Sequence, residues 1–254
     1  MANDLSILKG AGSALSSLDA YKNAVEQTQA AAGSSEYKRI SIRGKAFRVM
    51  HGKEEVKVFK SEPINIVIVG ASKVVRTFYD KDYDPKSDVP VFPSCWSNDG
   101  MRPDDRVPED KKCAASCREC PNDVKGSARQ GKGKACRSSM NLAVCIDGRW
   151  DDVYLMSIPA MSLFGKKQDQ NYPLQAYLRV LAANKAPMQA VVTEVSFDED
   201  ADVPKLFFKP VEMLDEARFL DIMEKANDPE NEKLLDLDFS NTDLDGGDDV
   251  ALPA

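Results

Sequence analysis

Five of the six cysteines of this 254-residue chain fall between residues 95 and 136, among glycine, proline, lysine and arginine. A segment of this composition is too polar to be held folded by burial alone. Thiolates separated by two residues, as in Cys117 and Cys120, can reach one ion from a tight turn. The N-terminus has no secretory signal, so we expect a reducing cytosol, where clustered cysteines favour a metal over disulfides. The sequence therefore predicts a zinc site in this loop, with a disulfide framework as the alternative.

Zinc takes four ligands, and the cysteines offer more than one way to supply them. Cys117 and Cys120 are the first two expected ligands, and Cys136, which follows the flexible GKGK run, is the third. The fourth ligand is open between Cys95 and Cys113. We favour Cys95 because its CWSNDG segment has the composition of a turn that needs an anchor. Four thiolates would close the coordination sphere, so the expected zinc is structural rather than catalytic.

The sequence shows no catalytic constellation. His51 is the only histidine, so there is no second imidazole to act as a general base. Walker A, GxSxG and HExxH motifs are absent from the sequence. A nuclease would need carboxylates gathered around an open metal site, and the candidates Asp99, Asp104 and Asp105 are scattered. The chain is therefore not expected to be an enzyme.

Charge is distributed unevenly along the chain. From Val211 to Ala254, fourteen acidic and three basic residues give a net charge of -11, which leaves +4 for the preceding residues of a chain that carries -7. Between Lys111 and Arg137, eight basic residues stand against two acidic ones. A basic loop and an acidic end indicate a polyanionic partner, with the acidic end as its competitor or as an arm that docks on other proteins. A solubilising tail is the alternative.

Basic and aromatic residues occur together around the cysteine loop. Lysine and arginine neutralise phosphates, and exposed rings stack on unpaired bases. For each ring the alternative is core packing, and for the basic glycine-rich run it is a solvated loop. The predicted nucleic-acid ligands are Lys73, Arg76, Tyr79, Trp96, Lys125, Arg129, Lys132, Lys134 and Arg137.

The elements that must position these residues are mostly strands. Alternating polar and apolar residues predict a meander from residue 37 to residue 79, with one strand closing at Gly70 and another following it. An Asp-Gly turn predicts a hairpin of residues 141–146 and 153–158, with Cys145 in the core. The other expected elements are helices at 174–183 and 212–226 and strands at 189–197 and 205–209.

The composition divides the chain into four parts. An Ala/Ser/Gln-rich stretch at 1–35 predicts a helical arm, which packs on the body or touches a neighbouring protomer. The β-rich core spans 36–210 and includes the zinc loop at 95–137. A C-terminal helix at 211–227 and a disordered acidic tail at 228–254 complete the chain.

Several motifs together resemble a known protein family. Phe78-Tyr79, CWSNDG at 95–100, CRECP at 117–121, GKGKAC at 131–136 and the acidic end are similar to the single-stranded DNA-binding, helix-destabilising replication proteins of tailed bacteriophages. The motifs cover about residues 79–144, and the similarity to the protein of the T-even phages is one of plan. The zinc set of that protein includes a histidine, which has no counterpart in the loop here.

The resemblance implies an α+β, mainly β fold. It would contain an OB-like barrel with an inserted cysteine-rich zinc loop, flanking helices and a disordered acidic C-terminal tail. It also implies binding of single-stranded DNA without marked sequence preference, self-association along the strand, and docking of the tail on replication or recombination proteins.

The expected location is the cytoplasm, that of the host cell if the protein is phage-encoded, and no run of residues is long and apolar enough for a membrane span. The main rival interpretation is a zinc-containing protein-interaction module, such as a phage transcription cofactor.

Overall fold

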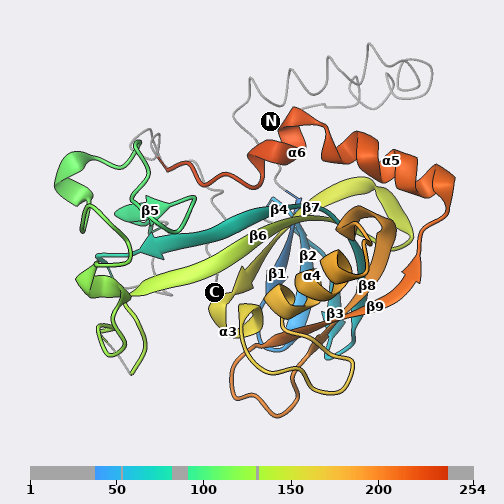
Figure 1. The fold of residues 1–254 in the computed structure, drawn as a ribbon, viewed down its shortest axis with the longest axis horizontal. Coiled ribbons are helices and arrows are strands. Elements are labelled where there is room, and N and C mark those ends of the chain that lie inside the picture. Colours follow the sequence, from blue (N-terminus) through green and yellow to red (C-terminus); the bar gives the residue numbers. More distant parts are fainter. Residues whose placement is uncertain (1–37, 53, 82–90, 130–131, 240–254) are drawn as a thin grey trace, which may run out of the picture. The chain divides into compact units, whose positions relative to one another are not determined.

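The computed structural model describes residues 38–52, 54–81, 91–129 and 132–239 (Figure 1). The predicted N-terminal arm and residues 240–254 of the predicted tail lie outside the described residues. The described chain is mainly β, with a curled, open sheet and a few helices. None of its described helices is long and apolar enough to cross a bilayer.

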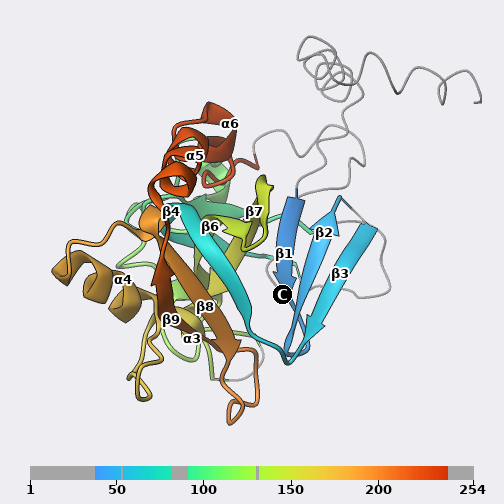
Figure 2. The same ribbon diagram turned by 90° about the vertical axis from the view of Figure 1, so that its right-hand side faces the viewer.

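One nine-stranded sheet organises the described chain. Strands β1 to β3 form an antiparallel meander, and β1 joins β7 in parallel through the single pair Arg39↔Leu155. The two ends of the sheet, β3 and β9, do not pair with each other, so the described strands form a half-barrel and not a closed barrel (Figure 2). Along the sheet the order is β3 (Glu54–Lys60), β2 (Ala46–His51), β1 (Lys38–Ile42), β7 (Arg149–Pro159), β6 (Cys136–Ile146), β4 (Ile64–Phe78), β8 (Val191–Phe197) and β9 (Leu206–Met213), and β5 (Cys95–Ser97) pairs with β4.

The longest strand, β4, merges two predicted strands. The sequence predicts that the chain breaks at Gly70, whereas β4 passes through this residue with a shift in its register to β6. A Cβ atom at Gly70 would stand 3.0 Å from Leu235 Cδ1, so the glycine allows a close approach of the C-terminal chain and does not end a strand. The meander prediction also fails beyond β3, because β4 pairs with β6, β8 and β5 and not with β3.

The main core lies on one face of the sheet, under α3 (Ala160–Leu163) and α4 (Leu174–Ala183). Leu174, Tyr177 and Leu181 of α4 are buried, as expected for residues spaced three and four apart on one helix face. The Tyr177 hydroxyl lies 2.6 Å from Thr193 Oγ1 on β8, which satisfies both groups in the core. The predictions of this helix and of the β6–β7 hairpin are confirmed.

The opposite face of the sheet is covered by α5 (Glu216–Ala226), which the sequence predicts to start four residues earlier. Those earlier residues belong to β9 and to the connection, and the Asp215 side chain caps α5 by accepting a hydrogen bond from the Arg218 amide. Ile222 packs against Cys145, and both side chains are fully buried. The prediction that Cys145 belongs to the core is confirmed.

The predicted disorder from residue 228 onward is wrong for residues 228–239. Helix α6 (Pro229–Lys233) follows α5, and an extended segment then runs to Phe239. This docked segment, residues 234–239, alternates partly or fully buried apolar side chains with exposed aspartates. Leu235 lies beside Gly70 on β4, and residues 236–239 contact the part of the chain that carries the cysteines.

Candidate metal centre and nucleic-acid interface

The cysteine lobe, which comprises the described residues between 91 and 135, is inserted between two paired strands. Strand β4 ends at Phe78 and β6 begins at Cys136, which are partners in the ladder. Strand β5 pairs with the other edge of β4, where Cys95 is the partner of Phe78. The register therefore places Cys95 and Cys136 on the two sides of one residue, although they are far apart in the sequence.

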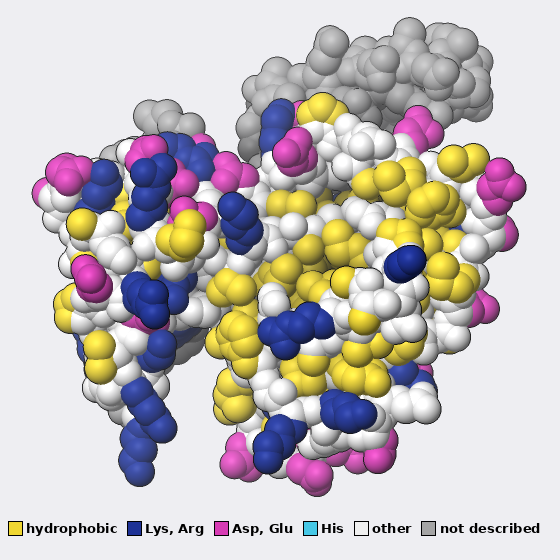
Figure 3. Space-filling model, viewed as in Figure 1, with side chains coloured by type: hydrophobic (Ala, Val, Ile, Leu, Met, Phe, Trp, Pro, Cys, Tyr) yellow, Lys and Arg dark blue, Asp and Glu magenta, His cyan; other side chains and the backbone are white. Residues whose placement is uncertain are grey.

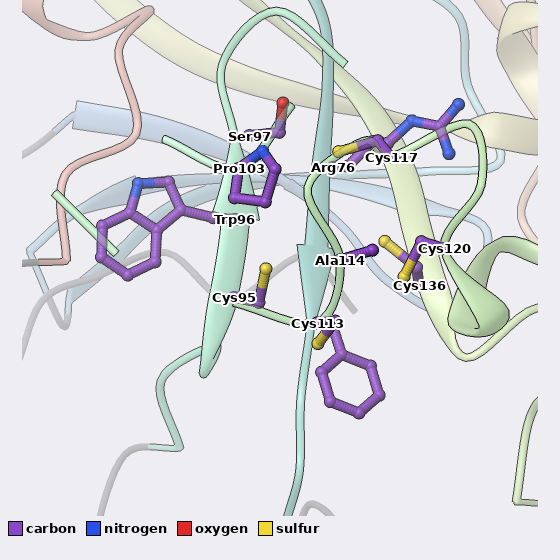
Figure 4. Close-up of a pocket in the computed structure, with 11 residues that line it drawn as sticks. Arg76, Cys95, Trp96, Ser97, Pro103, Cys113, Ala114, Cys117, Cys120 and Cys136 are labelled. Atoms are coloured by element: carbon purple, nitrogen blue, oxygen red, sulfur yellow. The ribbon is translucent and has the colours of Figure 1, made fainter. Parts of the chain in front are cut away.

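Five cysteines line one small cavity in this lobe. Its volume is about 20 Å³, which leaves room for roughly one water-sized guest. Figure 4 shows the five sulfur atoms around this space, with Arg76 and Trp96 at its border. His51 is on β2 and Cys145 is under α5, and neither lines the cavity. The lining cysteines are Cys95, Cys113, Cys117, Cys120 and Cys136.

Burial makes three of these thiols hard to ionise, those of Cys113, Cys117 and Cys136. It raises the pKa of Cys136 to about 12. Burial and the neighbouring Cys95 raise the pKa of Cys113 to about 11, and burial raises the pKa of Cys117 although Ser97 and Arg76 act against it. A metal ion would have to displace the thiol protons, so its binding would become tighter as the pH rises.

The donor set fits a zinc ion in type and number. Soft thiolates are the ligands that structural zinc takes, and the cavity has room for one ion rather than a cluster. Within the described residues, no three His, Cys, Asp or Glu side chains are already arranged to hold an ion. Metal binding would therefore involve adjustment of the cysteine side chains. Cys113 lies with the other four cysteines, so the choice between it and Cys95 as fourth ligand stays open.

Arg76 is not an exposed nucleic-acid ligand, contrary to the prediction. Its side chain is only 20% exposed, and its Nη1 lies 2.5 Å from Asp123 Oδ2. Lys134 pairs with the same carboxylate at 2.9 Å. Burial would raise the pKa of Asp123, but the ion pair with Arg76 and the hydrogen bond from Lys134 outweigh it and lower this pKa. Arg76 thus connects β4 to the turn that follows Cys120.

Two of the scattered carboxylates hold local structure in the lobe. Asp99 Oδ1 accepts hydrogen bonds from Ser97 Oγ and from two backbone amides, and so closes a tight turn. Gly100 in this turn has a φ of +71°, and a Cβ atom there would lie 2.6 Å from the Val74 carbonyl oxygen. Asp104 accepts hydrogen bonds from the Arg106 side chain, which lower its pKa and orient the guanidinium.

Trp96 is buried and not exposed, so the prediction of a ready stacking surface is wrong. The residue is 3% exposed. Phe239 of the docked segment is 6% exposed and meets the indole edge-on, with ring centroids 5.3 Å apart. Phe92 also lies near Phe239, at 6.5 Å between centroids. The C-terminal chain therefore covers the ring that the sequence predicts to stack on bases.

The docked segment is held by polar contacts as well as by this aromatic pair. Arg106 Nη1 lies 2.8 Å from Asp236 Oδ2 and 3.2 Å from Asp238 Oδ2. The Asn98 side chain donates to the Leu237 carbonyl and accepts from the Leu237 amide, both at 2.8 Å. Asn98, Arg106 and this segment are not among the site residues predicted from the sequence. The alternation of leucine and aspartate in LLDLDF is the signal that could have revealed the segment as an extended, half-buried chain.

Most of the other predicted nucleic-acid ligands lie on the lobe surface. Figure 3 shows lysine and arginine side chains spread over the visible face of the lobe, together with some acidic ones. Arg137 lies over the partly buried Tyr79 ring at 5.7 Å, and Arg129 donates a hydrogen bond to the Asp80 carbonyl. Lys134 is exposed but paired with Asp123. The remaining exposed predicted ligands are Lys73, Lys125 and Lys132.

Comparison with protein families, with characterised proteins and with solved structures finds no match to this chain. The features that bear on function lie in the lobe: the cysteine-lined cavity, the basic surface, and the docking surface formed by Trp96, Asn98 and Arg106, which holds the acidic, aromatic docked segment.

Proposed function

We propose that this protein binds single-stranded DNA without marked sequence preference and coats it during phage replication or recombination. The observation that supports this best is the way in which the docked segment, residues 234–239, binds to the cysteine lobe. The docked segment presents an aromatic ring to Trp96 and two carboxylates to Arg106. A nucleotide strand offers the same chemistry, a stacking base and anionic phosphates.

In this proposal the exposed cations of the lobe and of β4 hold the phosphate chain. They are Lys73, Lys125, Arg129, Lys132, Lys134 and Arg137. Tyr79 offers part of its ring beside Arg137, and Trp96 and Arg106 become available when the docked segment leaves. The curled open sheet would serve as an OB-like groove beside the lobe.

Zinc would be structural in this protein. Four of the five cavity cysteines would hold it, with Cys95, Cys117, Cys120 and Cys136 as the favoured set and Cys113 as the alternative ligand. When bound, the ion supplies no chemistry on the nucleic acid. It would fix the basic lobe, so that less ordering entropy is lost when a strand binds.

The acidic C-terminal chain would bind the cysteine lobe in the absence of nucleic acid and other proteins once it is released. While it is docked it competes with nucleic acid for Arg106 and Trp96, and when released it is available to replication or recombination proteins. The expected cytoplasmic location, self-association along DNA and the absence of enzymatic activity belong to the same proposal.

A specific observation also favours the alternative, a zinc-containing protein-interaction module. The lobe holds a peptide by both backbone and side chains, since Asn98 pairs with the Leu237 backbone while Arg106 pairs with Asp236. A module of this kind would bind acidic peptides tightly and bare single strands poorly.

The test is a fluorescence-anisotropy titration of labelled oligo-dT across a salt series, with a duplex of equal length as control. We expect salt-sensitive binding to the single strand and clearly weaker binding to the duplex, and the salt slope gives the number of phosphates contacted. Absence of binding at low salt would refute the proposal and leave the peptide-binding module.

A further inference from the structure

Arg76 occupies an unusual place for an arginine. It lies on β4 between β5 and β6, the two strands that carry Cys95 and Cys136. Its side chain lines the same cavity as the five cysteines, beside Cys117 in Figure 4. A guanidinium in a cysteine-lined cavity needs an electrostatic reason, because burying a charge costs free energy unless it is paired.

Only part of its hydrogen-bonding capacity is used by protein oxygen. Nη1 forms the ion pair with Asp123. The buried Nε atom has no hydrogen-bond partner within the described part of the chain. Arg76 lines the cavity together with Cys117 and Cys136. Metal-bound thiolates accept hydrogen bonds from nearby N–H groups. The buried Nε–H group of Arg76 lies beside the thiols and could serve as such a donor.

The net charge of a zinc–thiolate centre also points to Arg76 as its partner. A zinc ion with four thiolates carries a net charge of about -2, and such a charge in a largely buried site requires nearby cations. Asp123 adds a further negative charge, which Lys134 offsets. Among the described residues that line the cavity, Arg76 is the cation that can compensate the charge of the thiolates.

We propose that Arg76 is a positioning residue of the thiolate centre, which compensates its charge through N–H groups directed at sulfur and fixes the Cys117–Cys120 turn on β4 through Asp123. The inference rests on the proposed zinc site. It removes Arg76 from the nucleic-acid surface and assigns it to the metal.

The experiment compares the full-length wild-type chain with Arg76→Met, Arg76→Lys and Lys60→Met. Lys60 is an exposed cation on β3, another strand of the same sheet, and serves as the control. Zinc affinity is measured by competition with a chromophoric chelator, and the thiolate-to-metal charge-transfer band is recorded after loading with Co²⁺. Loss of an outer-shell partner typically weakens metal binding by about 10–100-fold. We expect a loss of this size and a shifted charge-transfer band for Arg76→Met, a smaller loss for Arg76→Lys, and no change for Lys60→Met.

The outcomes separate this inference from the proposal on which it depends. If the wild-type chain binds neither ion, the zinc site is refuted and the role of Arg76 is refuted with it. If the wild-type chain binds zinc and Arg76→Met shows the same affinity and the same band, the zinc site stands and the role of Arg76 is refuted. If Arg76→Met does not fold, Asp123→Asn replaces it, because it removes the ion pair that orients the guanidinium. Wild-type zinc affinity in Asp123→Asn would contradict the proposed positioning.

Discussion

Release of the docked segment should expose Trp96 and strengthen binding to single strands. The most direct perturbation is Phe239→Ala. Burial of a phenylalanine contributes about 1.5–3 kcal/mol, and an edge-to-face aromatic pair adds about 0.5–1.5 kcal/mol. Because Phe239 is 6% exposed and packs on Trp96, its loss should weaken docking by about 2–4 kcal/mol. That change shifts the docking equilibrium by on the order of 30-fold or more.

The acidic contacts should contribute less than the ring. The side chains of Arg106, Asp236 and Asp238 are 34%, 49% and 44% exposed, so solvent screens their ion pairs. The double change Asp236→Asn and Asp238→Asn should therefore weaken docking by about 1–2 kcal/mol at low salt and by less at high salt. The effect of Phe239→Ala on docking should therefore depend little on salt, whereas the effect of the double aspartate change should decrease as salt rises.

The assay is acrylamide quenching of Trp96 fluorescence in a Trp150→Phe background, combined with oligo-dT affinity. We expect Phe239→Ala to raise quenching at all salt concentrations and to tighten oligo-dT binding. Phe164, directly after α3, is 54% exposed, so Phe164→Ala should leave both readouts unchanged. If Trp96 stays protected in Phe239→Ala, the docked segment does not cover it in solution. If Trp96 becomes exposed while oligo-dT binding stays the same, the surface under the docked segment is not a nucleic-acid site.

Three further changes test the fold and the site. Gly100→Ala should destabilise the protein by more than about 1 kcal/mol in urea unfolding, because φ is positive and the new Cβ would meet the Val74 carbonyl oxygen, and an unchanged midpoint would contradict this turn geometry. Asp198 is 6% exposed and its pKa is lowered, first by Lys205, so its ion pair stabilises the fold above about pH 4 and is lost as the pH falls through the lowered pKa. The stability difference between wild type and Asp198→Asn should therefore shrink below about pH 4, and a difference that stays constant in acid would count against the pairing. Cys145→Ala should leave the zinc content unchanged, since Cys145 lies in the core away from the cavity, and loss of zinc in this variant would show that the ligand set is wrong.

Local patterns in the sequence were sufficient for elements whose partners are close in the chain. The Asp-Gly turn predicts the β6–β7 hairpin, and helical periodicity predicts α4, because in both cases neighbouring residues supply the contacts. Cysteine spacing likewise identifies the lobe in which five thiols share one cavity. These features depend on backbone preferences and on side chains a few residues apart.

Tertiary structure decided the features that depend on distant partners. Gly70 looks like a break, yet β4 continues through it because strands from two other parts of the chain pair with it and Leu235 needs the space of the missing side chain. Trp96 looks exposed in its polar loop, yet Phe239 covers it. The free energy that fixes both comes from burial and pairing between segments about seventy or more residues apart, which no local pattern contains.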